Sequence, residues 1–111
     1  MKQGDLIKEI LSTYGKHGWT LQRALLRRET RAQLIDDEQH PLEGTFIAES
    51  NFDALWFSRP SHNQREAWEL RLVAEIPYAL FETFAADEVE ELREQARQRM
   101  ESRMLEYLAR T

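Results

Sequence analysis

The segment DALWFSRPSHNQREAWELRLV, residues 53–73, decides the predicted fold. Two runs of aromatic and aliphatic residues flank a polar stretch that contains Pro60, Ser61 and Asn63. Residues of this kind favour turns, so the segment predicts a β-hairpin. Successive side chains of a strand point to opposite faces, and a shift of the pairing by one residue therefore exchanges the two faces. The register of this hairpin is the main question that the sequence raises.

We expect Phe57 to pair with Trp68, because this register also sets Arg59 opposite Glu66, a favourable pair of opposite charges. The competing register sets Trp56 opposite Trp68, but it also places two arginines against each other. In the expected register, Trp56 lies on the outer face, where either a helix covers it or a partner contacts it. The expected inner face carries Leu55, Phe57, Trp68, Leu70 and Leu72, and the outer face carries Ala54, Trp56, Glu69, Arg71 and Val73.

The remaining sequence predicts helices near both ends of the chain and further strands between them. Apolar residues recur at spacings of three and four in residues 5–14 and 89–108, which is typical of amphipathic helices. Residues 19–27, 45–50 and 78–84 favour strands. Residues 21–28 fit a helix nearly as well, but the two glycines and the tryptophan before them favour a strand. We therefore predict a single α+β domain over residues 1–111, with an N-terminal helix, a three- to four-stranded antiparallel sheet, and a long C-terminal helix packed on one sheet face.

Helix ends and connectors give weaker signals. Asp5 is expected to cap the first helix, and Asp87 with Glu90 predicts a capping box before the last one. Residues 28–44 are polar and contain a proline and a glycine, so we expect a connector there with at most one helical turn at 31–35.

Composition limits the classes of function. The net charge is −5 and the pI is about 5.2, and an acidic surface repels phosphate backbones, so nucleic-acid binding is not expected. The arginines at 23, 27, 28 and 31 are then best explained as a solvated cluster. The absence of cysteine excludes disulfides and thiolate chemistry. We see no secretory signal and no run that could span a bilayer, and we expect a cytoplasmic protein without a membrane partner.

Catalytic and metal-binding patterns are not evident. His17, His40 and His62 fall in predicted loops without the spacing of metal ligands, and the acidic pair Asp36–Asp37 is expected to be solvated. No glycine-rich phosphate loop and no nucleophile motif can be written. We therefore expect no catalytic residue, no cofactor and no metal. The order Gly15, Gly18-Trp19 and Leu21 after a helix is similar to that of some small bacterial domains of unknown function, and this resemblance implies no activity.

The sequence leaves two hypotheses for function. The first is a non-enzymatic interaction module that binds itself as a homodimer or binds another protein, because aromatic residues, methionine and arginine are enriched where proteins associate. Its expected surface consists of Trp56, Arg71, Met104, Tyr107 and Leu108. The alternative is a domain or enzyme that binds a small anionic ligand, since arginine matches carboxylate and phosphate groups. Its expected pocket consists of Trp56, Arg59, Arg71 and Tyr78.

Overall fold

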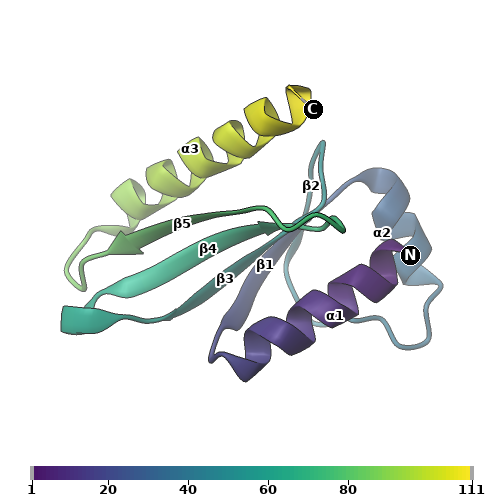
Figure 1. The fold of residues 1–111 in the computed structure, drawn as a ribbon, viewed down its shortest axis with the longest axis horizontal. Coiled ribbons are helices and arrows are strands. Elements are labelled where there is room, and N and C mark those ends of the chain that lie inside the picture. Colours follow the sequence, from purple (N-terminus) through teal and green to yellow (C-terminus); the bar gives the residue numbers. More distant parts are fainter. Residues whose placement is uncertain (1, 111) are drawn as a thin grey trace.

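The computed structural model describes residues 2–110, which form three α-helices, one short 3-10 helix and five β-strands (Figure 1). The helices are α1 (Gln3–Lys16), α2 (Arg28–Ile35) and α3 (Glu90–Ala109), and the 3-10 helix is η1 (His62–Gln64). The strands are β1 (Thr20–Leu26), β2 (Ile47–Glu49), β3 (Ala54–Pro60), β4 (Glu66–Leu72) and β5 (Ala79–Phe84). The predicted α+β fold, with its long C-terminal helix on one sheet face, is confirmed.

The described strands form one mixed sheet in the order β2-β1-β3-β4-β5. Neighbouring strands run antiparallel except β1 and β2, which run parallel. A parallel pair requires a crossover connection, and α2 lies in the crossover between β1 and β2. The sheet therefore has one or two strands more than expected, and the predicted connector at 28–44 begins with a full helix.

Helices lie against both faces of the sheet (Figure 1). We call them the α3 face and the α1 face. The buried core of the α3 face includes Leu25, Trp56, Trp68, Leu70, Leu72, Leu80, Phe84, Met100 and Met104. The buried core of the α1 face includes Leu6, Ile7, Ile10, Ala24, Leu26, Leu34, Leu55, Phe57 and Val73. Among the described helices, none is long and apolar enough to cross a membrane.

The predicted hairpin register is wrong by one residue. Trp56 pairs with Leu70, and Ser58 pairs with Trp68. Trp56 therefore shares the α3 face with both residues, whereas its neighbour Phe57 points to the α1 face. The expected register rests on the pairing of Arg59 with Glu66, but Arg59 lies opposite Ala67 and Glu66 lies opposite Pro60. Because helices cover both faces of β3, its consecutive large residues are all buried, and the pairing of Arg59 with Glu66 does not form.

The hairpin turn forms where the sequence predicts it, but the predicted helix caps do not form. Asn63 has a φ of 58°, in the left-handed region that asparagine tolerates better than most residues. The residues that precede α1 and α3 are Lys2 and Val89, and neither makes a side-chain capping hydrogen bond. Both helices start at positions other than those that Asp5 and Asp87 suggest, because α1 begins at Gln3 and α3 begins at Glu90.

Candidate functional site

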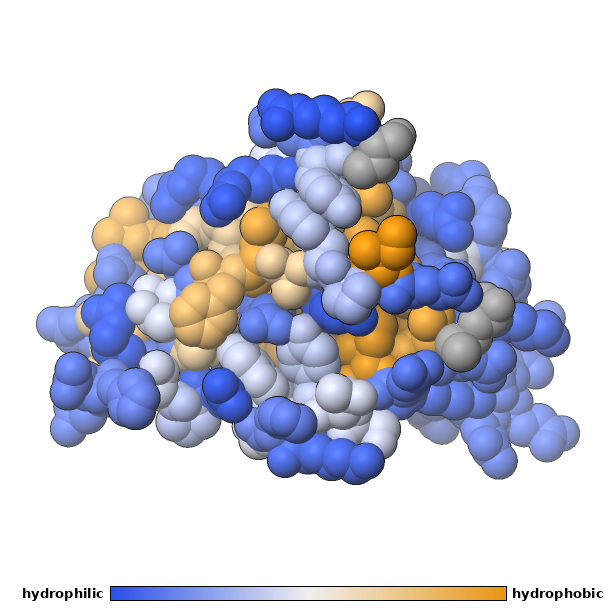
Figure 2. Space-filling view, in the orientation of Figure 1, coloured by the Kyte–Doolittle hydropathy of each residue, from blue (hydrophilic) through white to orange (hydrophobic). Residues whose placement is uncertain are grey.

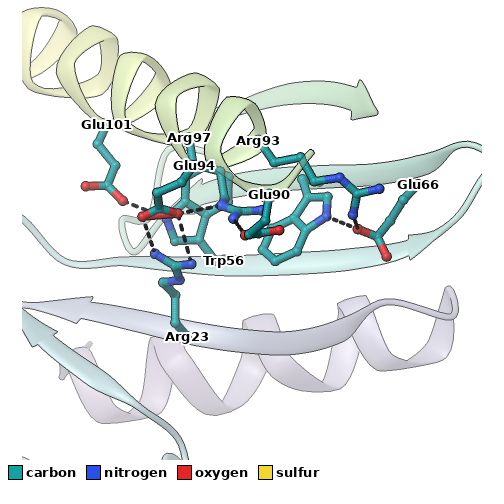
Figure 3. Close-up of polar contacts among 9 residues, drawn as sticks. Arg23, Trp56, Glu66, Glu90, Arg93, Glu94, Arg97 and Glu101 are labelled. Carbon is teal, nitrogen blue, oxygen red and sulfur yellow. Dashed lines mark hydrogen bonds and ion pairs between the residues drawn. The ribbon is translucent and has the colours of Figure 1, made fainter. Parts of the chain in front are cut away.

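A β-bulge in β1 directs Arg23 toward α3. Leu21 pairs with Phe57 and Arg23 pairs with Trp56, so one extra residue lies between two consecutive pairs. A bulge of this kind changes which face a side chain occupies. The guanidinium of Arg23 donates hydrogen bonds of 3.2 and 3.3 Å to the two carboxylate oxygens of Glu94 on α3 (Figure 3).

Arg97 is a buried charge between α3 and the sheet. Its side chain is only 2% exposed, and it donates to Glu94 at 2.8 Å and also to Glu90. Its guanidinium lies 4.5 Å from the ring centre of Trp68. A buried charge is tolerated only when it is paired, and here two carboxylates and one aromatic face compensate Arg97.

Both tryptophans of the α3 face have hydrogen-bond partners. The indole N–H of Trp56 donates to Glu101 at 2.9 Å, and that of Trp68 donates to Glu66 (Figure 3). Glu66 also forms an ion pair with Arg93 at 3.4 Å. The large apolar rings thus stay buried while their polar atoms bind charged groups at the margin of α3.

The electrostatics of this network stabilise the ionised form of its central carboxylate. Burial alone would raise the pKa of Glu94, but the hydrogen bonds from Arg23 and Arg97 outweigh burial and hold this pKa below its ordinary value. Glu94 is therefore a charged ion-pair partner at neutral pH. The hydrogen bond from Arg23 of β1 to Glu94 of α3 attaches this helix to the sheet.

The predicted interaction residues do not form one surface. Trp56 and Met104 are fully buried, each with 0% exposure. Tyr107 is half-buried and stacks on Tyr78, with ring centres 3.6 Å apart, and Leu108 packs beside the same core. Arg71 belongs to the opposite face, because it alternates with Leu70 and Leu72 along β4. The cause is the register shift, which moves Trp56 under α3.

The four residues of the predicted anion pocket lie on two sides of the sheet. Trp56 and Tyr78 pack on the α3 face, whereas Arg59 and Arg71 lie on the α1 face. The two guanidinium groups also have partners already. Arg59 donates to the carbonyl of His17 at 2.7 Å, and Arg71 donates to the carbonyl of Leu72. These residues therefore do not line one pocket.

A different part of the sheet is open. On the α1 face, Phe57, Glu69 and Phe81 lie side by side across β3, β4 and β5. The ring of Tyr14 on α1 stacks on Phe57 at 4.2 Å, and its hydroxyl donates to Glu69. Burial, followed by the hydrogen bond to Glu69 and its negative charge, raises the pKa of Tyr14 above its ordinary value. Tyr14 thus remains a donor, and the helix cover ends at this position.

Aromatic side chains continue from Tyr14 toward solvent. Trp19 lies 6.0 Å from Tyr14, and Arg59 stacks over the Trp19 ring at 4.4 Å. The edge of Trp19 meets Phe81 at 6.5 Å. Phe81 is 54% exposed, so it forms the solvent end of this aromatic series.

The strand β5 also forms one edge of the described sheet. Ala79 and Phe81 are exposed along it, and Ile76 in the preceding loop is 77% exposed. We call Trp19, Ile76, Ala79 and Phe81 the β5 surface. Figure 2 shows orange and tan side chains in an interrupted band across this side of the molecule, between blue regions above and below. Apolar side chains beside an open strand edge are typical of a binding surface.

The opposite edge of the sheet differs in length. It consists of β2, which has only three residues, whereas β5 has six. Phe46, just before β2, is 68% exposed. Short edge strands offer few main-chain groups to another chain. The β5 edge is therefore the better candidate for strand pairing.

Asp53 is a buried carboxylate whose role the sequence did not reveal. It accepts hydrogen bonds from Gln3 at 2.8 Å, from Thr30 at 2.6 Å and from the main-chain N–H of Arg27 at 2.8 Å. These donors come from α1, from α2 and from the residue before α2. Asp53 thus connects both helices to the start of β3, and both of its oxygens accept hydrogen bonds within the fold.

The histidines lie apart from one another in the fold. His17 follows α1, His40 accepts a hydrogen bond from the N–H of Leu42, and His62 begins the 3-10 turn. Residues 2–110 contain no group of three or more side chains suited to hold a metal ion.

Comparison of this chain with protein families, with curated proteins and with solved structures finds no match. The candidate surface therefore depends on geometry alone. Sequence reasoning assigned Phe81 to the expected strand at 78–84 but not to a functional surface. The alternation of Ala79, Phe81 and Thr83 was visible, but the position of β5 at the sheet edge was not.

Proposed function

We propose that this protein is a non-enzymatic interaction module that binds another protein chain through the β5 surface. The observation that carries the proposal is the exposed Phe81, which lies on an uncovered part of the sheet beside the free edge of β5. Large aromatic side chains at such positions contribute much of the binding energy at protein interfaces. An edge strand adds main-chain hydrogen bonds when another strand pairs with it.

The α3 network supports a structural role for the opposite face. Arg97 and Glu94 of α3 are held by internal partners, and Trp56 of β3 lies beneath this helix. The first hypothesis from the sequence, a homodimer or a binder of another protein, is thereby kept with a different surface. The cytoplasmic location and the lack of nucleic-acid binding also remain predictions.

The test compares two matched substitutions at exposed phenylalanines. Phe81→Glu introduces a charge into the β5 surface, whereas Phe46→Glu introduces the same charge at the opposite edge. Association is measured by sedimentation of the pure protein and by binding to proteins that the parent retains on an affinity resin. We expect Phe81→Glu alone to lose association, with unchanged thermal melting. Equal association of Phe81→Glu and the parent in both assays would refute the proposal.

A further inference from the structure

The main-chain groups of β5 are divided between β4 and the open edge. The N–H of Leu72 donates to the carbonyl of Tyr78 at 2.9 Å, which fixes the phase of the ladder between β4 and β5. Bonded and non-bonded pairs alternate in an antiparallel ladder. Every second residue of β5, starting at Leu80, therefore points its N–H and C=O toward β4. Ala79, Phe81 and Thr83 point theirs toward the open edge.

One of these outward groups already has a partner. Arg65 donates to the carbonyl of Thr83 at 3.1 Å and to its hydroxyl at 2.9 Å. At the other end of the strand, the residue in the outward phase is Pro77, which has no N–H to donate. The edge thus lacks a free acceptor at Thr83 and lacks a donor at Pro77.

We propose that two copies of this chain pair through their β5 edges, antiparallel and about a two-fold axis, with Leu80 of one copy opposite Leu80 of the other. This inference rests on the proposed function and names its partner. In this register Ala79 faces Phe81 of the second copy, and each such pair exchanges two hydrogen bonds. Thr83 faces Pro77 of the second copy, so the acceptor that Arg65 occupies meets the residue that cannot donate.

The side chains fit the same register. On the α1 face, the large ring of Phe81 lies opposite the small Ala79 of the second copy, which leaves room for it. On the α3 face, Glu82 lies opposite Tyr78, so no like charges meet across the new pair. The next register in the same phase, shifted by two residues, sets Ala79 opposite Thr83, whose carbonyl Arg65 already occupies. A shift by four residues sets Glu82 opposite Glu82, which brings two negative charges together. The preferred register is therefore self-complementary in shape, charge and hydrogen bonding.

A second copy suits this edge because a two-fold axis repeats every contact. The two sheets then join into one continuous sheet, and the exposed Phe81 is covered in both copies. Native proteins protect long strand edges with prolines or charges. Beside β5, Pro77 and Arg65 protect the two ends of the edge, and the main-chain groups of Ala79 and Phe81 between them stay open.

The chain contains no cysteine, so single cysteines report the register directly. Leu80→Cys places two thiols on the axis in a non-hydrogen-bonded pair, where Cα atoms are about 4.5 Å apart and within disulfide range. Glu82→Cys is the control on the same strand, because its two copies are about 13 Å apart along the strands. We expect mild oxidation to link Leu80→Cys into a covalent dimer and to leave Glu82→Cys unlinked.

Leu80 is buried, so Leu80→Cys could disturb the fold. A second pair of variants therefore changes exposed residues only. Ala79→Cys and Phe81→Cys change exposed positions. A mixture of the two should form a disulfide between unlike chains, whereas each alone should stay unlinked. Self-linking of Phe81→Cys, or linking of Glu82→Cys, would overturn the register.

Ala79→Pro tests the hydrogen bonds themselves. It removes one outward N–H, and proline is tolerated on an edge strand when its nitrogen faces solvent. We expect at least about a tenfold weaker dimer by sedimentation, with melting unchanged. A parent chain that sediments as a monomer at all concentrations would overturn the homodimer. Suppose that the parent is a monomer but retains another protein on the affinity resin, and that Phe81→Glu does not. The proposed interaction function would then stand, and only the self-pairing would be wrong.

Discussion

The two faces of the sheet are covered in different ways. On the α3 face lies a 20-residue helix. Its Glu94, Arg97 and Glu101 contact Arg23 of β1, Trp68 of β4 and Trp56 of β3, respectively. On this face the indole N–H groups and the guanidinium of Arg97 are paired inside the fold, so they are not offered to a partner.

On the α1 face, a shorter helix of 14 residues packs through aliphatic residues and through Tyr14 near its end, and Phe81 stays exposed. The incompletely covered face keeps apolar side chains such as Phe81 in solvent. Burial of these side chains by a partner would contribute the most favourable free energy of binding.

The largest effect should come from the centre of the covered face. Trp56→Ala removes a fully buried ring and leaves Glu101 without its indole donor. Loss of a buried tryptophan typically lowers the free energy of unfolding by about 3–5 kcal/mol. Urea denaturation should show a protein that is unfolded or nearly so. Trp56→Phe should lose less, and a parent-like midpoint for Trp56→Ala would contradict the burial of this face.

The core residue Trp68 should behave similarly, although its ring lies nearer the margin of α3. Trp68→Ala removes the surface on which Arg97 stacks and the indole donor to Glu66. We expect a loss of about 3 kcal/mol by the same measurement. An unchanged midpoint would show that α3 does not depend on this ring.

An intermediate effect is expected at Arg97. Arg97→Ala leaves a void over Trp68 and removes the buried partner of Glu94. Removal of one partner of a buried pair costs several kcal/mol, but Glu90 is largely exposed and Glu94 keeps Arg23, so we expect about 2 kcal/mol. Arg99→Ala, at an exposed position of the same helix, is the control. Equal stability of these two variants would show that the network does not hold α3.

A smaller effect should appear in acid. The pKa of Glu94 is lower in the folded chain than in the unfolded chain, so its contribution is present above the ordinary glutamate pKa and is lost as pH falls through the folded value. The unfolding free energy of the parent should therefore fall more steeply below about pH 4.3 than that of Glu94→Gln. Denaturation curves at several pH values measure this difference. Parallel curves would show that Arg23 and Arg97 do not stabilise the carboxylate.

The smallest change in stability is expected on the open face. Phe81→Glu alters a half-exposed ring whose main contact is the edge of Trp19, so the free energy of unfolding should change by only about 0.5 kcal/mol. Thermal melting at low protein concentration checks this value. A loss as large as that of Arg97→Ala would mean that Phe81 belongs to the core rather than to a binding surface.

Some features of this protein follow from short segments of sequence. The apolar spacing of residues 89–108 predicted α3, and the turn residues around Asn63 predicted the hairpin. The strand at 78–84 was also predicted from local composition. Such signals succeed because helix periodicity and turn conformation depend on neighbouring residues.

Other features depend on contacts between distant segments. The register of β3 and β4 was mispredicted because three large consecutive residues, Leu55, Trp56 and Phe57, fit a strand only when both faces are covered. The ion pairs of Arg97 with Glu90 and Glu94 lie within its own helix, but its contact with Trp68 of β4 is not revealed by the helix sequence. Likewise, composition does not distinguish an edge strand from a central one, so the exposure of Phe81 depended on the sheet order. The sequence by itself determined the elements and their apolar patterns, whereas the tertiary structure decided which faces were covered, because coverage is a property of packed layers and not of any single segment.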